Sequence, residues 1–199
     1  MLYLASQSPR RSQLLGQIGV SFTVLAPPEG AEALEAQRAG EAPARYVQRV
    51  TLAKLQAAQQ ALQERALPPA PVLCADTCVA LGRRIYGKPQ GDADAARMLA
   101  ELAGREHTVL TAVALGVPGK AQPLQALSRS RVRFAPLSEG EIAAYVASGE
   151  PQGKAGAYAV QGLAAAFIER ISGSYSGIMG LPLFETAQML RVAGLCPLC

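Results

Sequence analysis

The chain has 199 residues, of which half are hydrophobic and 17% are charged, and its formal net charge is +4. This composition excludes a disordered chain and predicts one domain with a sizeable core. The modest positive charge, without a lysine run or a tryptophan, fits a small anionic ligand better than nucleic acid. No apolar run reaches the roughly 20 residues that a membrane span needs, and no signal-peptide pattern is present. We therefore expect a soluble, intracellular protein with no membrane partner.

The four cysteines fall into two pairs with different expectations. Cys74 and Cys78 lie in an apolar run, so we expect reduced core thiols. Cys196 and Cys199 form a C-x-x-C at the end of the sequence, without a second pair beside it. We expect residues 192–199 to be an inert tail, and an intermolecular zinc site or disulfide is the alternative.

The first predicted elements flank a polar motif. Residues 2–5 read as a strand and residues 12–18 as a helix, with Ser-x-Ser-Pro-Arg-Arg (residues 6–11) between them. Free N–H groups at a helix start, together with two guanidinium groups, form a good anion site. The alternative is a plain Ser-Pro helix start with two solvated arginines.

The remaining pattern mixes strands and helices and predicts an α/β fold with a mixed sheet flanked by helices. We expect Asp92 to cap a helix and Gly104 to end it, and Ser138 and Glu141 to form a capping box. The predicted strands are residues 22–25, 72–81, 85–86, 106–117, 122–134 and 164–171, and the predicted helices are 46–66, 92–102, 138–148 and 182–190.

Asp76 is the most informative acid, because it lies inside the apolar run LCADTCVAL, where an unpartnered carboxylate is costly. It serves a metal or an activated water, or it caps a neighbouring loop. Thr77 points to the opposite face of a regular strand. Lys54, Lys88 and Lys154 would form a triphosphate-sized cluster with the two arginines if they converged; otherwise each is a solvated lysine.

Other polar residues have competing interpretations. His107, the single histidine, would have to serve any nucleophile–histidine pair, although a hydrogen-bonding role at a strand start is the better interpretation. Gln161 could bind a base edge through its amide, or satisfy loop backbone. The sequence contains no G-x-S-x-G elbow, no Walker loop and no H-E-x-x-H motif.

Five stretches in register resemble the Maf family of nucleotide pyrophosphatases, over residues 2–191 and in the same order. They are Leu4-Ala5-Ser6-x-Ser8-Pro9-Arg10-Arg11, Ala75-Asp76-Thr77, Gly87-Lys88-Pro89, residues 154–162 (KAGAYAVQG) and residues 173–183 (GSYSGIMGLPL). Each motif alone is weak, but five in register are highly specific.

The resemblance implies hydrolysis of a nucleoside triphosphate between its α- and β-phosphates. It also implies a divalent metal, Mg²⁺ or Mn²⁺, a cytoplasmic role in cleaning the nucleotide pool, and a homodimer. The implied fold is an elongated mixed sheet with a cleft between two lobes, similar to inosine triphosphate pyrophosphatases. Ala-Asp-Thr resembles the branch acting on dTTP and UTP. The competing function is a non-catalytic nucleotide-binding regulator of cell division.

The resemblance also assigns roles to residues. Asp76 falls on the proton acceptor, and Glu35, with Asp76, falls on the metal side. The positions tied to substrate choice are Arg10, Thr77 and Gln161, and those on the phosphate side are Ser6, Arg11, Lys54, Lys88 and Lys154.

The sequence departs from the family pattern at three places. Leu34 precedes Glu35 where the family has Asp, and Glu32 is a rival for the metal-side carboxylate. Gly153 and Gly177 replace a common Asp and a common Asn.

Overall fold

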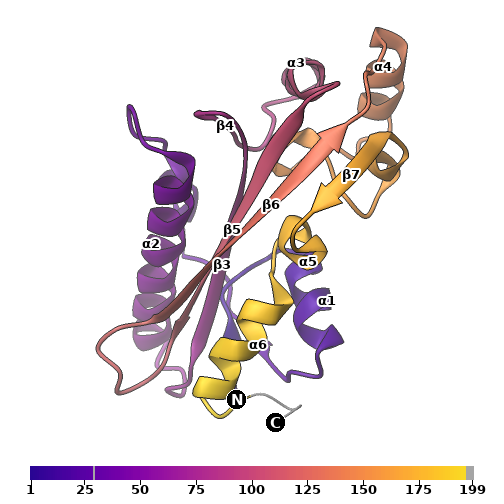
Figure 1. The fold of residues 1–199 in the computed structure, drawn as a ribbon. Helices are drawn as coiled ribbons and strands as arrows, with labels where there is room; N and C mark the ends of the chain where they lie inside the picture. The colour runs from indigo at the N-terminus through magenta and orange to yellow at the C-terminus, as the bar shows by residue number, and fades with distance from the viewer. Residues whose placement is uncertain (29, 196–199) are drawn as a thin grey trace.

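The computed structural model describes residues 1–28 and 30–195, and its centre is one mixed β-sheet (Figure 1). The strand order is β2-β1-β3-β5-β6-β7, with β4 also paired to β3. β1 runs parallel to β2 and β3, and the other pairs are antiparallel. The strands are β1 (Tyr3–Leu4), β2 (Thr23–Val24), β3 (Val72–Leu81), β4 (Arg84–Tyr86), β5 (Glu106–Gly116), β6 (Leu124–Phe134) and β7 (Ile168–Ser172).

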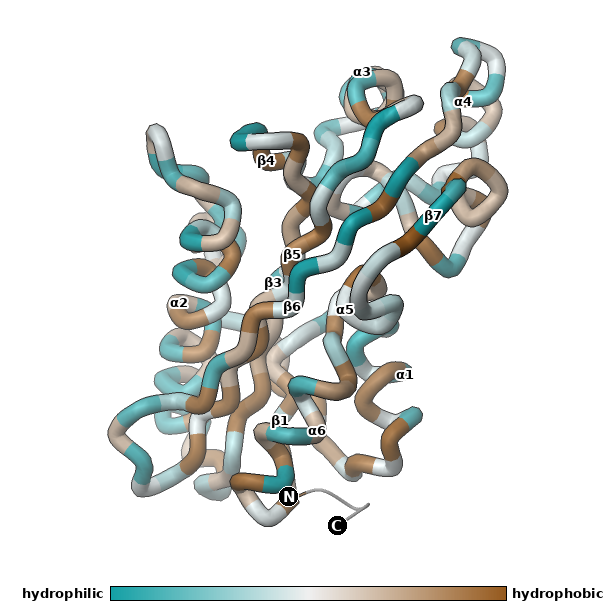
Figure 2. Tube along the Cα trace, in the orientation of Figure 1, coloured by the Kyte–Doolittle hydropathy of each residue, from teal (hydrophilic) through white to brown (hydrophobic). Residues whose placement is uncertain are grey.

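The burial of each strand follows its sequence pattern. β3 and β5 are mostly apolar and are buried on both faces. The second half of β6 alternates instead: Ser130, Val132 and Phe134 are buried, whereas Arg131 and Arg133 are exposed. Figure 2 shows this alternation of hydrophilic and hydrophobic positions along β6. One face of the sheet is therefore open to solvent at this end.

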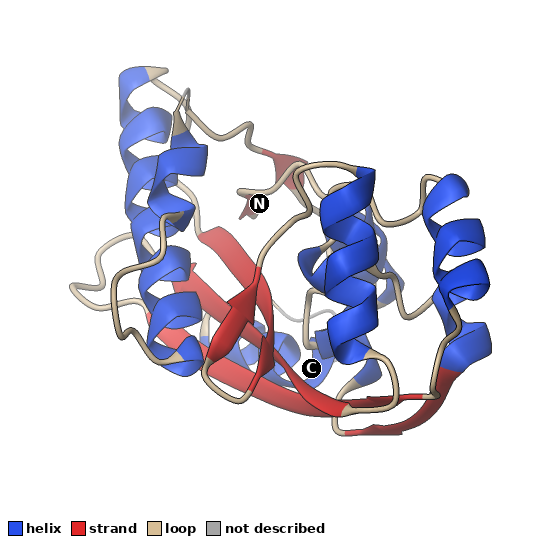
Figure 3. Ribbon diagram, turned by 90° about the horizontal axis from the view of Figure 1, so that it is seen from above, coloured by secondary structure: helices blue, strands red, loops and turns tan. Residues whose placement is uncertain are grey.

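Helices cover both faces of the central strands. α2 packs its Leu55 and Ala58 against Val72 and Cys74 of β3, whereas Leu73 of β3 faces the other way, toward α1 and α6. Figure 3 shows the strands as a curved band with helices beside it. The helices are α1 (Pro9–Gln17), α2 (Pro43–Glu64), α3 (Asp92–Leu102), α4 (Glu139–Ala147), α5 (Tyr175–Met179) and α6 (Leu183–Val192), with 3-10 turns η1 (Ala31–Glu35), η2 (Ala155–Ala157) and η3 (Leu163–Phe167).

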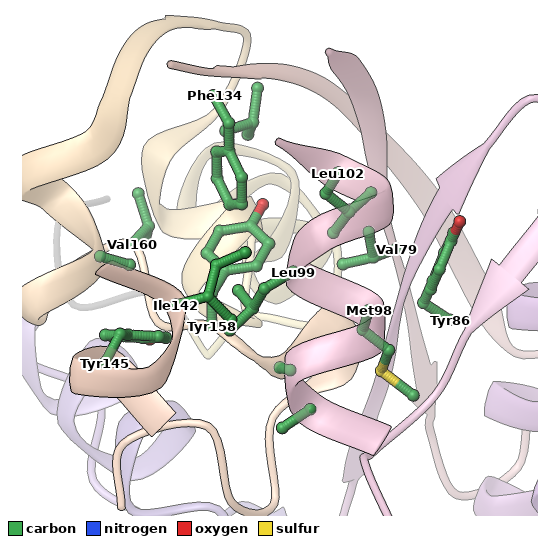
Figure 4. Packing of buried hydrophobic residues seen from close by; sticks show 14 of the residues in the cluster. Val79, Tyr86, Met98, Leu99, Leu102, Phe134, Ile142, Tyr145, Tyr158 and Val160 are labelled. Atoms are coloured by element: carbon green, nitrogen blue, oxygen red, sulfur yellow. The ribbon is translucent and has the colours of Figure 1, made fainter. Parts of the chain in front are cut away.

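A second core region lies at the far end of the sheet, under α3 and α4 (Figure 4). Phe134 is its centre: its ring makes edge contacts with Tyr158 and His107, each with centroids 4.8 Å apart, and with Phe167 at 5.0 Å. The long strands β3, β5 and β6 run through both core regions, so they connect the two ends of the molecule. The predicted mixed α/β sheet flanked by helices is confirmed.

Two local predictions are wrong. Asp92 is the first helical residue of α3 and Gly91 is its N-cap, while Gly104 follows the helix with φ of +68°, as expected. The predicted strand 164–171 begins only at Ile168, because residues 163–167 form the 3-10 turn η3. The carboxylate of Glu150 accepts hydrogen bonds from the N–H groups of Leu163 and Ala164, which favours a turn there.

The capping box of α4 is present as predicted. Within the part of the chain that the structure describes, no helix combines the length and apolarity that crossing a membrane requires. Leu195 packs against the core near α6, and Cys196 and Cys199 lie outside the described residues.

Candidate active site

A break in strand pairing creates a cavity beside the middle of β3. β1 pairs with Val72 and Leu73, and β4 pairs with residues 79–81, on the edge of β3 opposite to β5. Residues 74–78 lie between these two pairings. Asp76 and Thr77, which point to opposite faces of the strand, therefore both line one cavity of about 480 Å³.

All ten residues to which the family resemblance assigns roles line this cavity. They are Ser6, Arg10, Arg11, Glu35, Lys54, Asp76, Thr77, Lys88, Lys154 and Gln161. The rival carboxylate Glu32 lines it too, but no hydrogen bond or ion pair joins its side chain to another described residue. His107 lies apart from the cavity, buried against Phe134, with its Nε2 2.9 Å from the hydroxyl of Tyr158.

The guanidinium of Arg11 is fixed by three acceptors from three parts of the chain. Its Nε donates to the carbonyl of Gly180 at 2.8 Å, Nη1 to Ser6 Oγ at 3.3 Å, and Nη2 to Thr77 Oγ1 at 3.4 Å. α1 begins at Pro9, shortly after the end of β1, so Arg11 lies in the first turn of the helix, where it lines the cavity. Its remaining N–H groups make no hydrogen bond to the described residues and are available to an anion in the cavity.

Thr77 takes part in a hydrogen-bond chain with a defined direction. The buried Thr111 donates its one hydroxyl hydrogen to the carbonyl of Gly177 at 2.7 Å. Thr77, 2.9 Å from Thr111 Oγ1, must then donate to it. Since Arg11 donates to Thr77, that hydroxyl has only an acceptor lone pair left for a ligand.

Arg10 differs from its neighbour. It lines the cavity, but no hydrogen bond or ion pair joins its guanidinium to another described residue. Burial, and next the charge of Arg11, lower its pKa from the ordinary value, although an arginine remains protonated at any physiological pH. The site therefore contains an uncompensated positive charge, which an anionic ligand would offset.

Acidic and basic side chains alternate along the other wall of the cavity. Lys54 of α2 places its Nζ 2.6 Å from Asp76 Oδ1 and 2.6 Å from Glu35 Oε1. Lys88, which follows β4, lies 3.5 Å from Glu35 Oε2. Burial alone would lower the pKa of Lys54, but the two carboxylates outweigh burial and raise it. Burial alone would raise the pKa of Glu35. Hydrogen bonding and charge from Lys54, followed by the charge of Lys88, outweigh burial and lower that pKa.

The first turns of α2 hold the segment that carries Glu35. The hydroxyl of Tyr46 donates to the carbonyl of Glu35 at 2.9 Å. Arg49 donates to the carbonyl of Ala36 at 2.9 Å, and its Nε and Nη2 each lie 2.7 Å from an oxygen of Glu41. Sequence reasoning missed Tyr46 and Arg49; the opposite charges of Glu41 and Arg49, eight residues apart, were the available signal.

Glu35 and Asp76 are the groups available for a metal. The described residues contain no group of three or more histidine, cysteine or acidic side chains that could hold a metal ion. Mg²⁺ is commonly bound through one or two carboxylates together with substrate phosphates and waters. Two carboxylates that approach the same ammonium group from different elements fit that requirement.

Lys154 and Gln161 belong to one further segment that lines the cavity. Lys154 Nζ donates to the carbonyls of Glu150 at 2.9 Å and Gln152 at 3.0 Å. Burial, and next the charge of Arg10, lower the pKa of Lys154. The side chain of Gln161 is exposed in the cavity and makes no hydrogen bond within the described residues. Its amide is therefore available to a ligand.

The comparisons with known proteins identify the family of the chain. The family model "Maf-like protein" matches residues 1–193. The dTTP/UTP pyrophosphatase of Albidiferax ferrireducens is 63% identical over 195 residues, which cover 97% of this chain and 96% of that protein. The dTTP/UTP pyrophosphatase of a Polaromonas species is 60% identical and covers 98% and 96%, respectively.

A solved structure also aligns with this chain. It is that of the Staphylococcus aureus Ham1 protein, with a TM-score of 0.46 and 15% identity, and the alignment covers 67% of this chain and 71% of that one. Given a family match along almost the whole sequence and relatives at 60% identity or more, this chain belongs to the Maf-like protein family.

Proposed function

We propose that the protein hydrolyses dTTP and UTP to the nucleoside monophosphate and pyrophosphate. The observation that carries this proposal is the convergence of five cationic side chains and three carboxylates on one cavity. The cavity volume of about 480 Å³ lies in the usual range for small-molecule sites. Relatives named dTTP/UTP pyrophosphatase along nearly the full length support the substrate.

The charges suggest how a nucleotide lies in the cavity. We place the triphosphate against Arg11, Lys54 and Lys88, with the hydroxyl of Ser6 nearby. Arg11 provides a fixed fork of donors, and the lysines act as point charges. Lys154 joins them by exchanging its contacts with loop carbonyls for a phosphate oxygen. Arg10, Thr77 and Gln161 then border the rest of the nucleotide, including the base.

Asp76 is the proposed proton acceptor. It takes a proton from the water that attacks the α-phosphorus, while pyrophosphate leaves. Lys54 contacts the Asp76 carboxylate directly, so it holds that group in place and offsets charge that develops on the phosphates. Glu35 and Asp76 would hold Mg²⁺ or Mn²⁺, which when bound supplies further charge neutralisation.

A nucleotide panel tests the activity. Purified protein is incubated with dTTP, UTP, CTP and GTP in the presence of Mg²⁺ or Mn²⁺, and pyrophosphate release is measured with a coupled inorganic pyrophosphatase. We expect release from dTTP and UTP above the other two. Nucleotide binding without release from any substrate would overturn the proposal and favour a non-catalytic regulator.

The assembly and the cellular location are also proposals. The resemblance supports a cytoplasmic homodimer that consists of one domain per chain, with a nucleotide rather than nucleic acid as its ligand. Light scattering coupled to size-exclusion chromatography should give a mass near twice 20.8 kDa. A mass equal to a single chain would contradict the dimer.

A further inference from the structure

The main chain on either side of Gln161 is tied to two side chains from α4 and the segment after it. The hydroxyl of Tyr145 accepts a hydrogen bond from the N–H of Ala159 at 3.4 Å, just before Gln161. The carboxylate of Glu150 accepts from the N–H of Leu163 at 2.8 Å and from that of Ala164 at 3.2 Å, just after it. Tyr145 and Glu150 are themselves joined at 2.8 Å.

The carboxylate of Glu150 is also packed closely against the backbone of Gly162, the residue after Gln161. A Cβ atom added to Gly162 would lie 2.2 Å from Glu150 Oε2 and 2.5 Å from Oε1. The backbone of Gly162, with φ of −111°, is open to any residue, so the glycine is required by the carboxylate and not by the turn. The carbonyl of Glu150 meanwhile accepts from Lys154, at the other end of the same loop.

We propose that Glu150 is a positioning residue for base recognition. It holds the segment around Gln161 (residues 159–164, the Gln161 turn) against the cavity and does not touch the nucleotide. It does not line the cavity, and its carboxylate is used by main-chain N–H groups and Tyr145. The inference rests on the proposed function, because it takes Gln161 to contact the base. Preorganised contacts of this kind confer specificity because less ordering is left to the moment of binding.

The test compares Glu150→Gln with a matched control, Glu101→Gln. Glu101 also accepts from a tyrosine hydroxyl, that of Tyr86 at 2.6 Å, but it does not line the cavity and contacts no residue of the Gln161 turn. Affinities of α,β-imido analogues of UTP and CTP are measured by calorimetry with Mg²⁺ present. We expect Glu150→Gln to reduce the UTP-over-CTP ratio about tenfold, the equivalent of one lost hydrogen bond, and Glu101→Gln to leave it unchanged.

This ratio separates positioning from simple destabilisation. Unfolded protein lowers the binding stoichiometry but cancels in the ratio of two dissociation constants. A lower melting temperature with an unchanged ratio would therefore overturn the inference. Since the analogues need no turnover, a lack of pyrophosphate release by the wild type would sink the proposed activity and still leave this measurement valid.

Gly162→Ala provides a second line of evidence. In the wild-type background the added methyl group must displace the Glu150 carboxylate, so we expect the same reduction of the UTP-over-CTP affinity ratio. Combined with Glu150→Ala, the added methyl no longer meets the carboxylate, and the double variant should resemble Glu150→Ala alone. Additive losses would mean that Gly162 acts independently of Glu150, and the inference would fail.

Discussion

Asp76 is held in an extended strand with its carboxylate against Lys54 at 2.6 Å. Asparagine keeps the shape of the side chain and an oxygen for Lys54, but it is a very poor proton acceptor. We expect Asp76→Asn to reduce kcat by about 10²- to 10⁴-fold, with nucleotide affinity changed far less. Steady-state release of pyrophosphate and calorimetric binding measure the two effects. Glu169→Gln, which alters a surface ion pair with Arg133, is the control; comparable turnover in both variants would exclude the role.

The two adjacent arginines should respond differently to the same substitution. Lysine cannot reach Ser6, Thr77 and the carbonyl of Gly180 together, so Arg11→Lys loses at least one charge-assisted hydrogen bond worth about 1.5–3 kcal/mol. We expect it to lower the melting temperature and to reduce kcat/KM for dTTP at least about tenfold. Arg10→Lys removes no hydrogen bond or ion pair with the described residues and should leave the melting temperature nearly unchanged. Equal thermal shifts would contradict this distinction.

At the scale of elements, the loop that carries Lys154 depends on a glycine at its centre. Gly156 has φ of +70°, and a Cβ there would lie 2.8 Å from Val79 Cγ2 and 2.9 Å from its Cβ, on β3. Gly156→Ala should therefore cost about 2–4 kcal/mol of unfolding free energy, from backbone strain and overpacking together. Urea denaturation measures this cost.

Gly153→Ala is the control for that strain. Gly153 has φ of +69° in the same loop, but nothing lies within 4 Å of an added Cβ. It should cost only the backbone part, about 1–2 kcal/mol. If both substitutions cost the same, contact with Val79 contributes nothing, and the packing of the loop on β3 is looser than the structure indicates.

Local patterns predict elements well where one short-range rule dominates. The apolar run of β3, the long amphipathic α2 and the capping box of α4 each specify their own structure. The turn η3 escapes such rules, because a glutamate thirteen residues earlier binds its N–H groups. The gap between β1 and β4 depends likewise on pairing between distant segments. Motif resemblance selected ten of the residues that line the cavity, but it could not supply Tyr46, Arg49 or Glu150, which act through main-chain contacts.

At the scale of the whole molecule, β3, β5 and β6 join two core regions with the cavity beside their middle. The far core contributes Tyr158, which lines the cavity and packs on Phe134. The stability of that core and the shape of the site are therefore linked through one side chain. His107, buried beside both rings, makes this linkage dependent on pH.

Burial lowers the pKa of His107 to about 4, well below its ordinary value of 6.5. Between these values the unfolded chain binds a proton that the folded protein excludes, so the folded state loses stability as the pH falls from about 6.5 toward 4. His107→Gln removes this titration and keeps an amide that can bond to Tyr158, at some cost in stability at neutral pH. We expect its unfolding free energy, measured by urea denaturation from pH 7 to 5, to fall less steeply than that of the wild type. The carboxylates titrate in both proteins and cancel in the comparison, so parallel curves would show that His107 is not the group responsible.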